Sequence, residues 1–405
     1  MKKIIKVWIS VVITFILLTG CTVAENRVSS LNNSSAENRV SSLNNSSAEN
    51  SLSNLNNSSL ETDLDKYLQA VKYIKEKQYP QAMGVLREIS DYKDSKNLMD
   101  QLLYIINGSS IANGIWLVGA IAQDGGVQVA YAGEDDNKYD AARKWKGVKS
   151  LCARGGDSIE GLVEGKIVTT STVTKQELLN SKNAPTNAMA HVVESVLSWD
   201  NIKSFQTFYP QNALALTNDG RVLTAYSDYQ DKAKELQKWK DLIAVADGRS
   251  YLVGIKKDGT VINKNFDYNG TINTSDWKNI VAVAADSSVI GLREDGTVVS
   301  TGLNENGEGN VSDWKDIIAI STSRYCTLGL KRDGTVVATG SNTFGQMDVQ
   351  EWKDIVAISA GYYFSIGLKA DGTMLIAGDC SSSGVKTPDI TGMKGLYVPG
   401  IRVDE

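Results

Sequence analysis

The sequence predicts a mainly β chain, a seven-bladed β-propeller preceded by a small α-helical segment. Three observations support this. An acidic residue followed by glycine recurs seven times at a spacing near 38 residues, tryptophan recurs at a similar spacing, and short β-type runs separate these marks. The 405 residues include 35 glycines and only 5 prolines, which suits many tight turns. Repeats of about 40 residues with three or four short strands are typical of a propeller.

Each repeat reads as three strands. In the last full repeat the first strand begins at Ile355, the second is Ser365–Lys369 and the third is Thr373–Ala377. Asp371 and the glycine after it form the hairpin turn between the second and third strands, where glycine takes positive φ. In most repeats a small residue stands at the position that Gly367 holds in this one. We expect it to let another backbone approach closely.

The repeat count also predicts how the ring closes. The acid-glycine pairs begin at Asp124, Glu164, Asp219, Asp258, Asp295, Asp333 and Asp371. Tryptophan precedes the first strands at Trp145, Trp199, Trp239, Trp277, Trp314 and Trp352, and Met393 takes a seventh such place. The turn at Asp124 has no first strand ahead of it. We therefore expect the strand after Met393 to pair with residues 116–130, which removes an exposed sheet edge.

These repeats resemble the regulator-of-chromosome-condensation repeat family. The resemblance rests on the Gly-Leu-Lys-x-Asp-Gly-Thr-Val pattern, the Asn-x-x-Gly-Gln turn and the Trp-Lys-Asp start. It covers the chain from Trp116 to the C-terminus, within the predicted propeller at residues 112–405. It implies a seven-bladed propeller. Members of the family exchange guanine nucleotides on a GTPase or, in secreted bacterial cases, inhibit an enzyme. The resemblance thus implies a binding scaffold without naming the partner, because propeller function lies in the loops.

Residues 1–21 read as a lipoprotein signal peptide. A basic start precedes the apolar run Val7–Leu18, and the sequence Leu-Thr-Gly-Cys that ends at Cys21 resembles the bacterial lipobox. Cys21 is then the lipidation site; the alternative is an uncleaved anchor with an incidental cysteine. Both interpretations place the rest of the chain on the extracytoplasmic face of the cell membrane. That location excludes exchange activity on a cytoplasmic GTPase.

Residues 22–61 and 62–107 precede the propeller. The first segment contains a 12-residue tandem repeat rich in asparagine and serine, which predicts a disordered tether. The second has helical spacing of apolar residues, with Pro80 opening a second helix and Asp94 or Ser95 capping a third. The pattern around Tyr79 and Ala82 resembles one tetratricopeptide-type helix pair. One pair forms no solenoid groove, so we expect a docking or spacer unit.

A binding face is predicted at one end of the propeller axis. The first strand of each blade should be innermost, so the loop after it lies near the axis. Arginine and tyrosine dominate these loops, and both lead protein-interface hot spots. The alternative is that the tyrosines only plug the axis. The candidate partner-binding residues are Phe208, Tyr209, Arg249, Tyr251, Arg324, Tyr325, Tyr362 and Tyr363.

Other chemistry is not indicated. The net charge of −5 disfavours nucleic-acid binding. The single histidine, His191, has no nucleophile motif beside it, and we expect no catalytic residues, cofactor or metal. Glu134-Asp135-Asp136 reads as a solvated loop. The favoured function is a membrane-anchored scaffold that binds a partner protein at the cell surface. A cell-wall glycan or carbohydrate-binding module is the alternative, and an envelope enzyme is a third possibility without a recognisable triad.

Overall fold

The computed structural model describes residues 62–153, 158–170, 184–208, 212–226, 235–236, 238–248, 251–266, 272–381 and 386–403. Cys21 and the predicted tether lie outside these residues. Within the described part of the chain, none of the helices is both long enough and apolar enough to cross a membrane.

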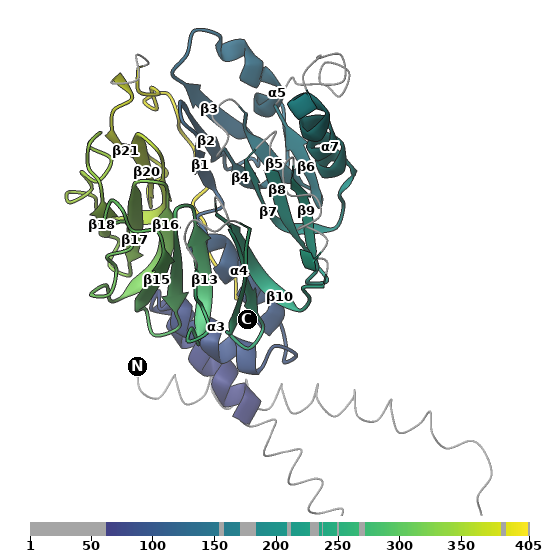
Figure 1. The fold of residues 1–405 in the computed structure, drawn as a ribbon. Helices are drawn as coiled ribbons and strands as arrows, with labels where there is room; N and C mark the ends of the chain where they lie inside the picture. The colour runs from purple at the N-terminus through teal and green to yellow at the C-terminus, as the bar shows by residue number, and fades with distance from the viewer. Residues whose placement is uncertain are drawn as a thin grey trace, which may run out of the picture. The chain divides into compact units, whose positions relative to one another are not determined.

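Seven antiparallel sheets of three strands each, in chain order, form the bulk of the structure (Figure 1). This confirms the predicted seven blades. The first three sheets are β1 (Ile111–Asn113), β2 (Leu117–Ile121) and β3 (Val127–Tyr131); β4 (Val148–Cys152), β5 (Glu160–Val163) and β6 (Lys166–Thr169); and β7 (Ile202–Phe208), β8 (Asn212–Thr217) and β9 (Val222–Tyr226). The other four are β10 (Leu242–Asp247), β11 (Tyr251–Lys256) and β12 (Val261–Asn265); β13 (Ile280–Ala285), β14 (Ser288–Arg293) and β15 (Val298–Gly302); β16 (Ile317–Thr322), β17 (Cys326–Lys331) and β18 (Val336–Gly340); and β19 (Ile355–Ala360), β20 (Phe364–Lys369) and β21 (Met374–Gly378).

The acid-glycine pairs form the hairpin turns between second and third strands, as predicted. Gly372 has a φ of +80°, which favours glycine. The Asp371 carboxylate accepts hydrogen bonds from the Thr373 backbone N–H at 2.9 Å and from its hydroxyl at 2.6 Å. The equivalent bonds recur at Asp258, Asp295 and Asp333. The recurring acid therefore holds the turn together, which explains its repetition.

The recurring small residue of the second strand has a different role from the one we expected. A Cβ atom on Gly291 would lie 2.6 Å from the Trp277 indole, and one on Gly367 would lie 2.7 Å from the Trp352 indole. The close neighbour is thus the tryptophan of the same repeat, and the expected approach of another backbone is wrong. Glycine and tryptophan recur together because the indole packs against the strand at the position where glycine has no side chain.

The seven sheets form a closed ring. Each sheet contacts the next along the chain, and β1 contacts β19 and β20 of the last sheet. In several places a polar side chain on the first strand of one blade forms a hydrogen bond with the backbone of the first strand in the next blade. The Asp247 N–H donates to Gln206 Oε1 at 2.8 Å, and the Ala360 N–H donates to Ser321 Oγ at 2.9 Å. At the junction of first and last sheets, the buried Asn113 donates to the Phe364 carbonyl at 2.9 Å.

The first sheet differs from the prediction in its innermost strand. The C-terminal segment does pair with β2, through an antiparallel bridge between Leu396 and Ala122. The rest of the inner position belongs to β1, which pairs with β2 from Ile111–Ala120 to Asn113–Val118. No repeat pattern in the sequence marks residues 111–113 as a strand. The two ends of the propeller chain thus share one strand position, since the segment after Leu396 turns away toward the helices.

The helical segment packs on the propeller. It consists of a helix at residues 62–75, α3 (Tyr79–Glu88) and α4 (Ser95–Ile106). Pro80 stands at the start of α3, as predicted. Asp94 occupies the N-cap position of α4 without capping it, because its carboxylate accepts a hydrogen bond from the Tyr67 hydroxyl at 2.5 Å.

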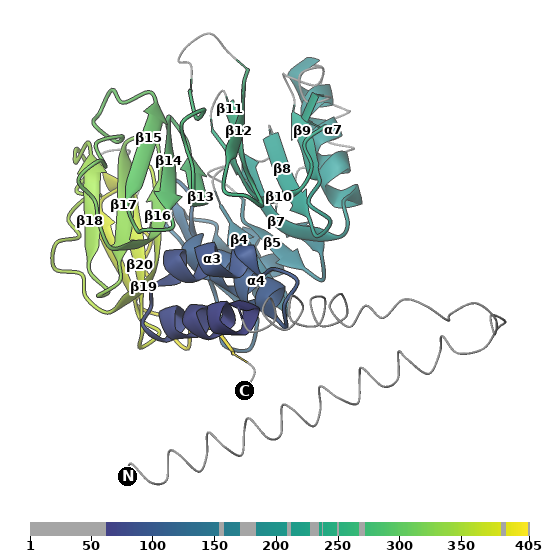
Figure 2. The same ribbon diagram turned by 90° about the horizontal axis from the view of Figure 1, so that it is seen from below.

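The helices cover the face of the propeller that carries the acid-glycine turns. The Arg87 guanidinium donates to the Ile280 carbonyl at 2.8 Å, and Gly84 lies against Glu294. Helix α4 contacts β13, β16 and β19, the first strands of three sheets (Figure 2). Just past α4, a Cβ on Gly108 would lie 2.8 Å from the Ile358 carbonyl. This end of the axis is therefore covered. The helical segment, which we expected to be a docking or spacer unit, packs on the propeller of its own chain.

Two insertions add helices to the blades. Helix α7 (Ala184–Ser198) contacts β6, β8 and β9, and His191 is exposed on it. The 3₁₀ helix η1 (Asp136–Tyr139) and α5 (Asp140–Arg143) follow β3 and pack on the first sheet. The side chains of Cys152, Cys326 and Cys380 are buried.

Candidate binding surface

Four of the predicted binding residues meet at the uncovered end of the axis. Arg324 and Tyr325 lie between β16 and β17, and Tyr362 and Tyr363 lie between β19 and β20. These loops join strands at the face opposite the acid-glycine turns. All four side chains are half-buried, so each keeps part of its surface open to solvent.

The tyrosines form a continuous aromatic cluster. The rings of Tyr325 and Tyr362 lie 4.7 Å apart in an edge-to-face arrangement, and their hydroxyl groups are 2.9 Å apart. Tyr362 and Tyr363 pack in the same way, also at 4.7 Å. Such pairs contribute about 0.5–1.5 kcal/mol beyond their buried area. Neighbouring blades therefore hold these side chains in fixed positions.

Phe344 joins the cluster, although it is not among the binding residues predicted from the sequence. It lies in the turn after β18, and its ring packs edge-to-face on Tyr363 at 4.8 Å. The Phe344 N–H donates to Gln346 Oε1 at 2.9 Å, which fixes the turn. The Asn-x-x-Gly-Gln pattern was recognised only as a turn. The third residue of this pattern, here Phe344, varies between repeats. This variation could have indicated a binding residue, because the position lies beside the axial loop of the next blade.

Arg324 adds a cation to the cluster. Its guanidinium carbon lies 5.5 Å from the centre of the Tyr325 ring, within cation–π range. We define the axial cluster as Arg324, Tyr325, Phe344, Tyr362 and Tyr363. It combines large rigid rings with a planar cation, the side-chain types that dominate interface hot spots.

Tyr251 does not belong to this surface. Only 2% of it is exposed, and its hydroxyl donates to the Ser287 carbonyl of the next blade. The tyrosine was predicted on the loop, but it starts β11 and points into the core. Phe208 ends β7, and its side chain is outside the described part. Tyr209 and Arg249 also lie outside the described residues.

The floor beneath the axial cluster is polar and closed. Thr322 and Thr327 hydroxyls are 2.8 Å apart, and Cys326 lies 3.5 Å from the Ser323 hydroxyl. All four are buried. Burial raises the pKa of the Cys326 thiol, so the thiol stays protonated at neutral pH and is a poor nucleophile. The floor supports the loops and offers no reactive group to a ligand.

Comparisons with known proteins bear on the fold. A family model described as regulator of chromosome condensation (RCC1) repeat matches residues 317–346, which span β16, β17 and β18. No curated protein matches the sequence. Among solved structures, the chain is similar to the CRINKLY WD40 ectodomain of the Arabidopsis thaliana receptor kinase ACR4. That match has 13% identity and a TM-score of 0.48, and covers 71% of this chain and 98% of the other.

Two further structures show the range of these likenesses. The ectodomain of the Physcomitrella patens receptor kinase CR4 matches at 13% identity and a TM-score of 0.47, covering 67% of this chain and 73% of that one. Prp20p from Saccharomyces cerevisiae, described with its binding to Gsp1p and histones, matches at 13% identity and a TM-score of 0.36, covering 71% of this chain and 76% of that one.

The seven three-stranded sheets define a β-propeller. One of its blades, at residues 317–346, matches the RCC1 repeat.

Proposed function

We propose that this chain is a binding scaffold that contacts a partner protein through the axial cluster. The observation that carries the proposal is the convergence of Arg324, Tyr325, Phe344, Tyr362 and Tyr363 at one end of the axis. The other end is covered by the chain's own helices. A partner that approaches along the axis therefore meets the aromatic end.

The residues that build each blade repeat along the chain, whereas the residues of the axial cluster do not, and this difference supports a binding function. Turn aspartates and packed tryptophans repeat because each blade needs them, whereas the loop positions differ between blades. The rings are half-buried against each other and are already held in place. Partner binding therefore costs little side-chain conformational entropy. RCC1-type neighbours such as Prp20p are described with protein partners, and we infer the same class of ligand here.

The proposal includes the location. The lipobox-like sequence at Cys21 would place the propeller on the extracytoplasmic face of a bacterial membrane through a lipid anchor. Mass spectrometry of the mature N-terminus tests this part separately: a diacylglycerol on Cys21 supports it, and an unmodified Cys21 contradicts it.

Affinity capture from surface proteins with the full chain tests the binding face. Arg324→Ala and Tyr363→Ala should each weaken capture of one specific protein by about 1–2 kcal/mol, with little change in stability. Lys257→Ala and Lys331→Ala, beside the acid-glycine turns, are the controls and should keep it. Loss in the controls alone would mean that the other face binds. A lower melting temperature for Tyr363→Ala with unchanged binding would mean that the tyrosines only plug the axis.

A glycan array separates the alternative ligand class. Aromatic rings also stack on sugars, so the same variants apply. Binding of the full chain to a wall glycan, lost in Tyr363→Ala and without any protein partner, would replace the proposed function with carbohydrate recognition.

A further inference from the structure

Strand β3 has an unpaired outer edge. It is the last strand of its sheet, and only β2 pairs with it. The hydrogen bonds at the two ends of the pair fix its register: the Ala122 N–H donates to the Gly126 carbonyl, and the Ala132 N–H donates to the Trp116 carbonyl, both at 2.9 Å. Bonded positions alternate in an antiparallel pair, so the even-numbered residues of β3 bond to β2.

The odd-numbered residues of β3 therefore direct their backbone groups away from the sheet. These residues are Val127, Val129 and Tyr131. Within the described part of the chain, no backbone group pairs with their N–H groups. A row of N–H groups without backbone partners is a template for an added strand.

A groove runs along this edge. One cavity of about 480 Å³ is lined by all five consecutive residues of β3, together with Asp136, Arg143 and Met393. Successive side chains of a strand point to opposite faces, so a cavity that touches all five must follow the edge. A second cavity of about 410 Å³ also touches Val127 and Arg143, and extends the groove toward Lys394.

Two walls flank the groove. On one face of β3, η1 and α5 pack against the strand, with the rings of Tyr131 and Tyr139 5.1 Å apart. On the other face lies the C-terminal segment, where the Lys394 N–H donates to Gln128 Oε1 at 3.0 Å. A strand edge recessed between two walls admits a single extended chain. It excludes the flat sheet edge of a second copy of this protein.

The blade's own returning segment leaves this groove open. In two other blades a polar side chain at the position of Val129 holds that segment against the sheet. Ser300 donates to the Gly309 carbonyl at 2.6 Å, and Asn263 donates to the Ile272 carbonyl at 3.5 Å. Val129 has no such group, and here the segment folds into η1 and α5 instead.

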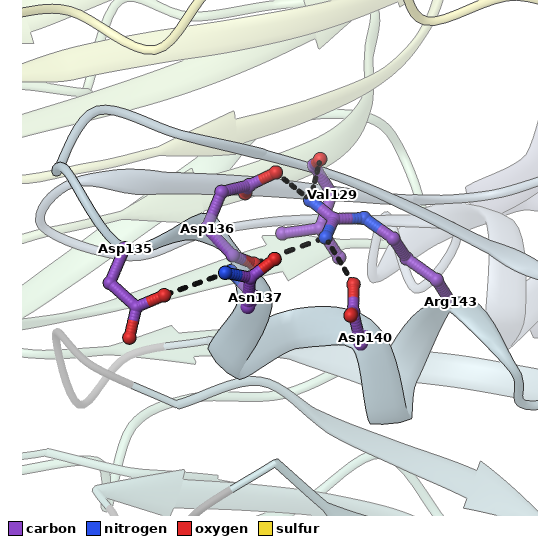
Figure 3. Close-up of polar contacts among 6 residues, drawn as sticks. All are labelled: Val129, Asp135, Asp136, Asn137, Asp140 and Arg143. Carbon is purple, nitrogen blue, oxygen red and sulfur yellow. Dashed lines mark hydrogen bonds and ion pairs between the residues drawn. The ribbon is translucent and has the colours of Figure 1, made fainter.

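Arg143 lines the groove and carries a positive charge. Figure 3 shows its polar contacts. Its guanidinium pairs with Asp136 at 2.6 Å and with Asp140 at 3.0 Å, and donates to the Val129 carbonyl at 3.3 Å. Residues 134–136 are exposed, as predicted for a solvated loop, and Asp136 also begins η1 and pairs with Arg143. Both aspartates are more than half exposed, so an incoming carboxylate can exchange with them at little cost.

We propose that this groove binds an extended peptide segment of a partner protein, which adds to β3 as a fourth strand. Backbone hydrogen bonds to Val127, Val129 and Tyr131 give the affinity, as in other cases of strand addition. An acidic side chain of the peptide pairs with Arg143 and sets the register. This site is separate from the axial cluster and does not depend on it.

The test uses a phage-displayed library of random peptides, panned on the full chain. We expect extended peptides with one fixed acidic position. Val129→Pro removes the outward N–H and leaves the bonds to β2 intact, since proline is tolerated at such edge positions. It should weaken the selected peptides by about tenfold, the loss expected for one hydrogen bond.

The matched control is Ala338→Pro in β18, because Ala338 holds the same register position in another blade. It should bind the peptides like the natural chain, as should Arg324→Ala and Tyr363→Ala at the axial cluster. Arg143→Ala should keep binding that depends on Val129 and lose the acidic preference. Selection of no peptide, or of peptides that bind Val129→Pro unchanged, would overturn the proposal.

Discussion

Ala122, directly after β2, forms an antiparallel bridge with Leu396, so the C-terminal segment is built into the first blade. Around this bridge the Gln123 N–H donates to the Gly395 carbonyl at 2.9 Å, and the Tyr397 N–H donates to the Ile121 carbonyl at 2.8 Å. Leu396 is fully buried. The ring is thus closed by main-chain pairing as well as by side-chain packing.

This bridge predicts a large effect of small C-terminal changes. Leu396→Ala should lower the free energy of unfolding by about 2–5 kcal/mol, the usual cost of truncating a buried leucine. Deletion of residues 393–405 should cost more, because it also opens the inner position of the first sheet. Chemical denaturation measures both. Lys394→Ala, an exposed neighbour, is the control, and equal losses for both alanine variants would contradict this account.

Asn113 predicts a second, polar contribution to closure. Its amide donates to Phe364 O at 2.9 Å, and its oxygen accepts from the Ser359 hydroxyl at 2.9 Å. Asn113→Ala leaves buried groups unpaired and should cost about 1–3 kcal/mol. Urea denaturation measures it, with the exposed Asn137→Ala as control. A double-mutant cycle with Ser359→Ala that shows no coupling would contradict the contact.

The contacts of Arg87 indicate that this residue helps to attach the N-terminal helices to the propeller. Its guanidinium lies between the turns of two blades, donates to the Ile280 carbonyl, and has Glu294 and Asp258 nearby. Arg87→Ala should cost about 1–3 kcal/mol and increase hydrogen exchange in residues 62–106 first. Arg332→Ala, on an exposed turn, should leave that exchange unchanged. Uniform loss of protection across the propeller would show that Arg87 is not a local anchor.

Glu160 predicts a pH dependence of stability. It is fully buried, accepts hydrogen bonds from Thr207 at 2.8 Å and Thr169 at 3.0 Å, and burial raises its pKa from 4.5 to about 7. The folded state therefore holds the proton more tightly than the unfolded state. The resulting stability is complete below pH 4.5 and is lost as the pH rises toward about 7.

Glu160→Gln should remove this dependence. At pH 8 the variant should be more stable than the natural chain by up to roughly 3 kcal/mol, and at pH 5 the difference should be much smaller. Denaturation curves at both pH values measure it. The exposed Glu164→Gln should retain the natural slope. An unchanged slope in Glu160→Gln would assign the dependence to other groups.

The blades were predictable from the sequence because each blade repeats the same contacts between residues close together in the chain. Asp371 binds its own turn, and Trp352 packs on Gly367 of the same repeat. Both contacts lie within one blade, so their spacing is visible in the chain. The repeated residues therefore revealed the number of sheets and the position of each turn.

The features missed depend on contacts between distant segments. The β1 strand, Ile111–Asn113, has no repeat pattern and forms because β2 and β19 flank it. Tyr251 looked like a loop tyrosine, but its hydroxyl bonds a carbonyl in the next blade. Phe344 reached the axial cluster from the blade's outer turn. Sequence spacing carries no information on such contacts between blades.

The most direct test of the central claim places a photo-crosslinking amino acid at Tyr363 of the full chain, in living cells. The matched site is Lys257, beside an acid-glycine turn. If the axial cluster is the binding surface, position 363 should give one defined protein adduct, abolished by Arg324→Ala, and position 257 should give none. An adduct from position 257 alone, or one from position 363 that persists in Arg324→Ala, would contradict the account.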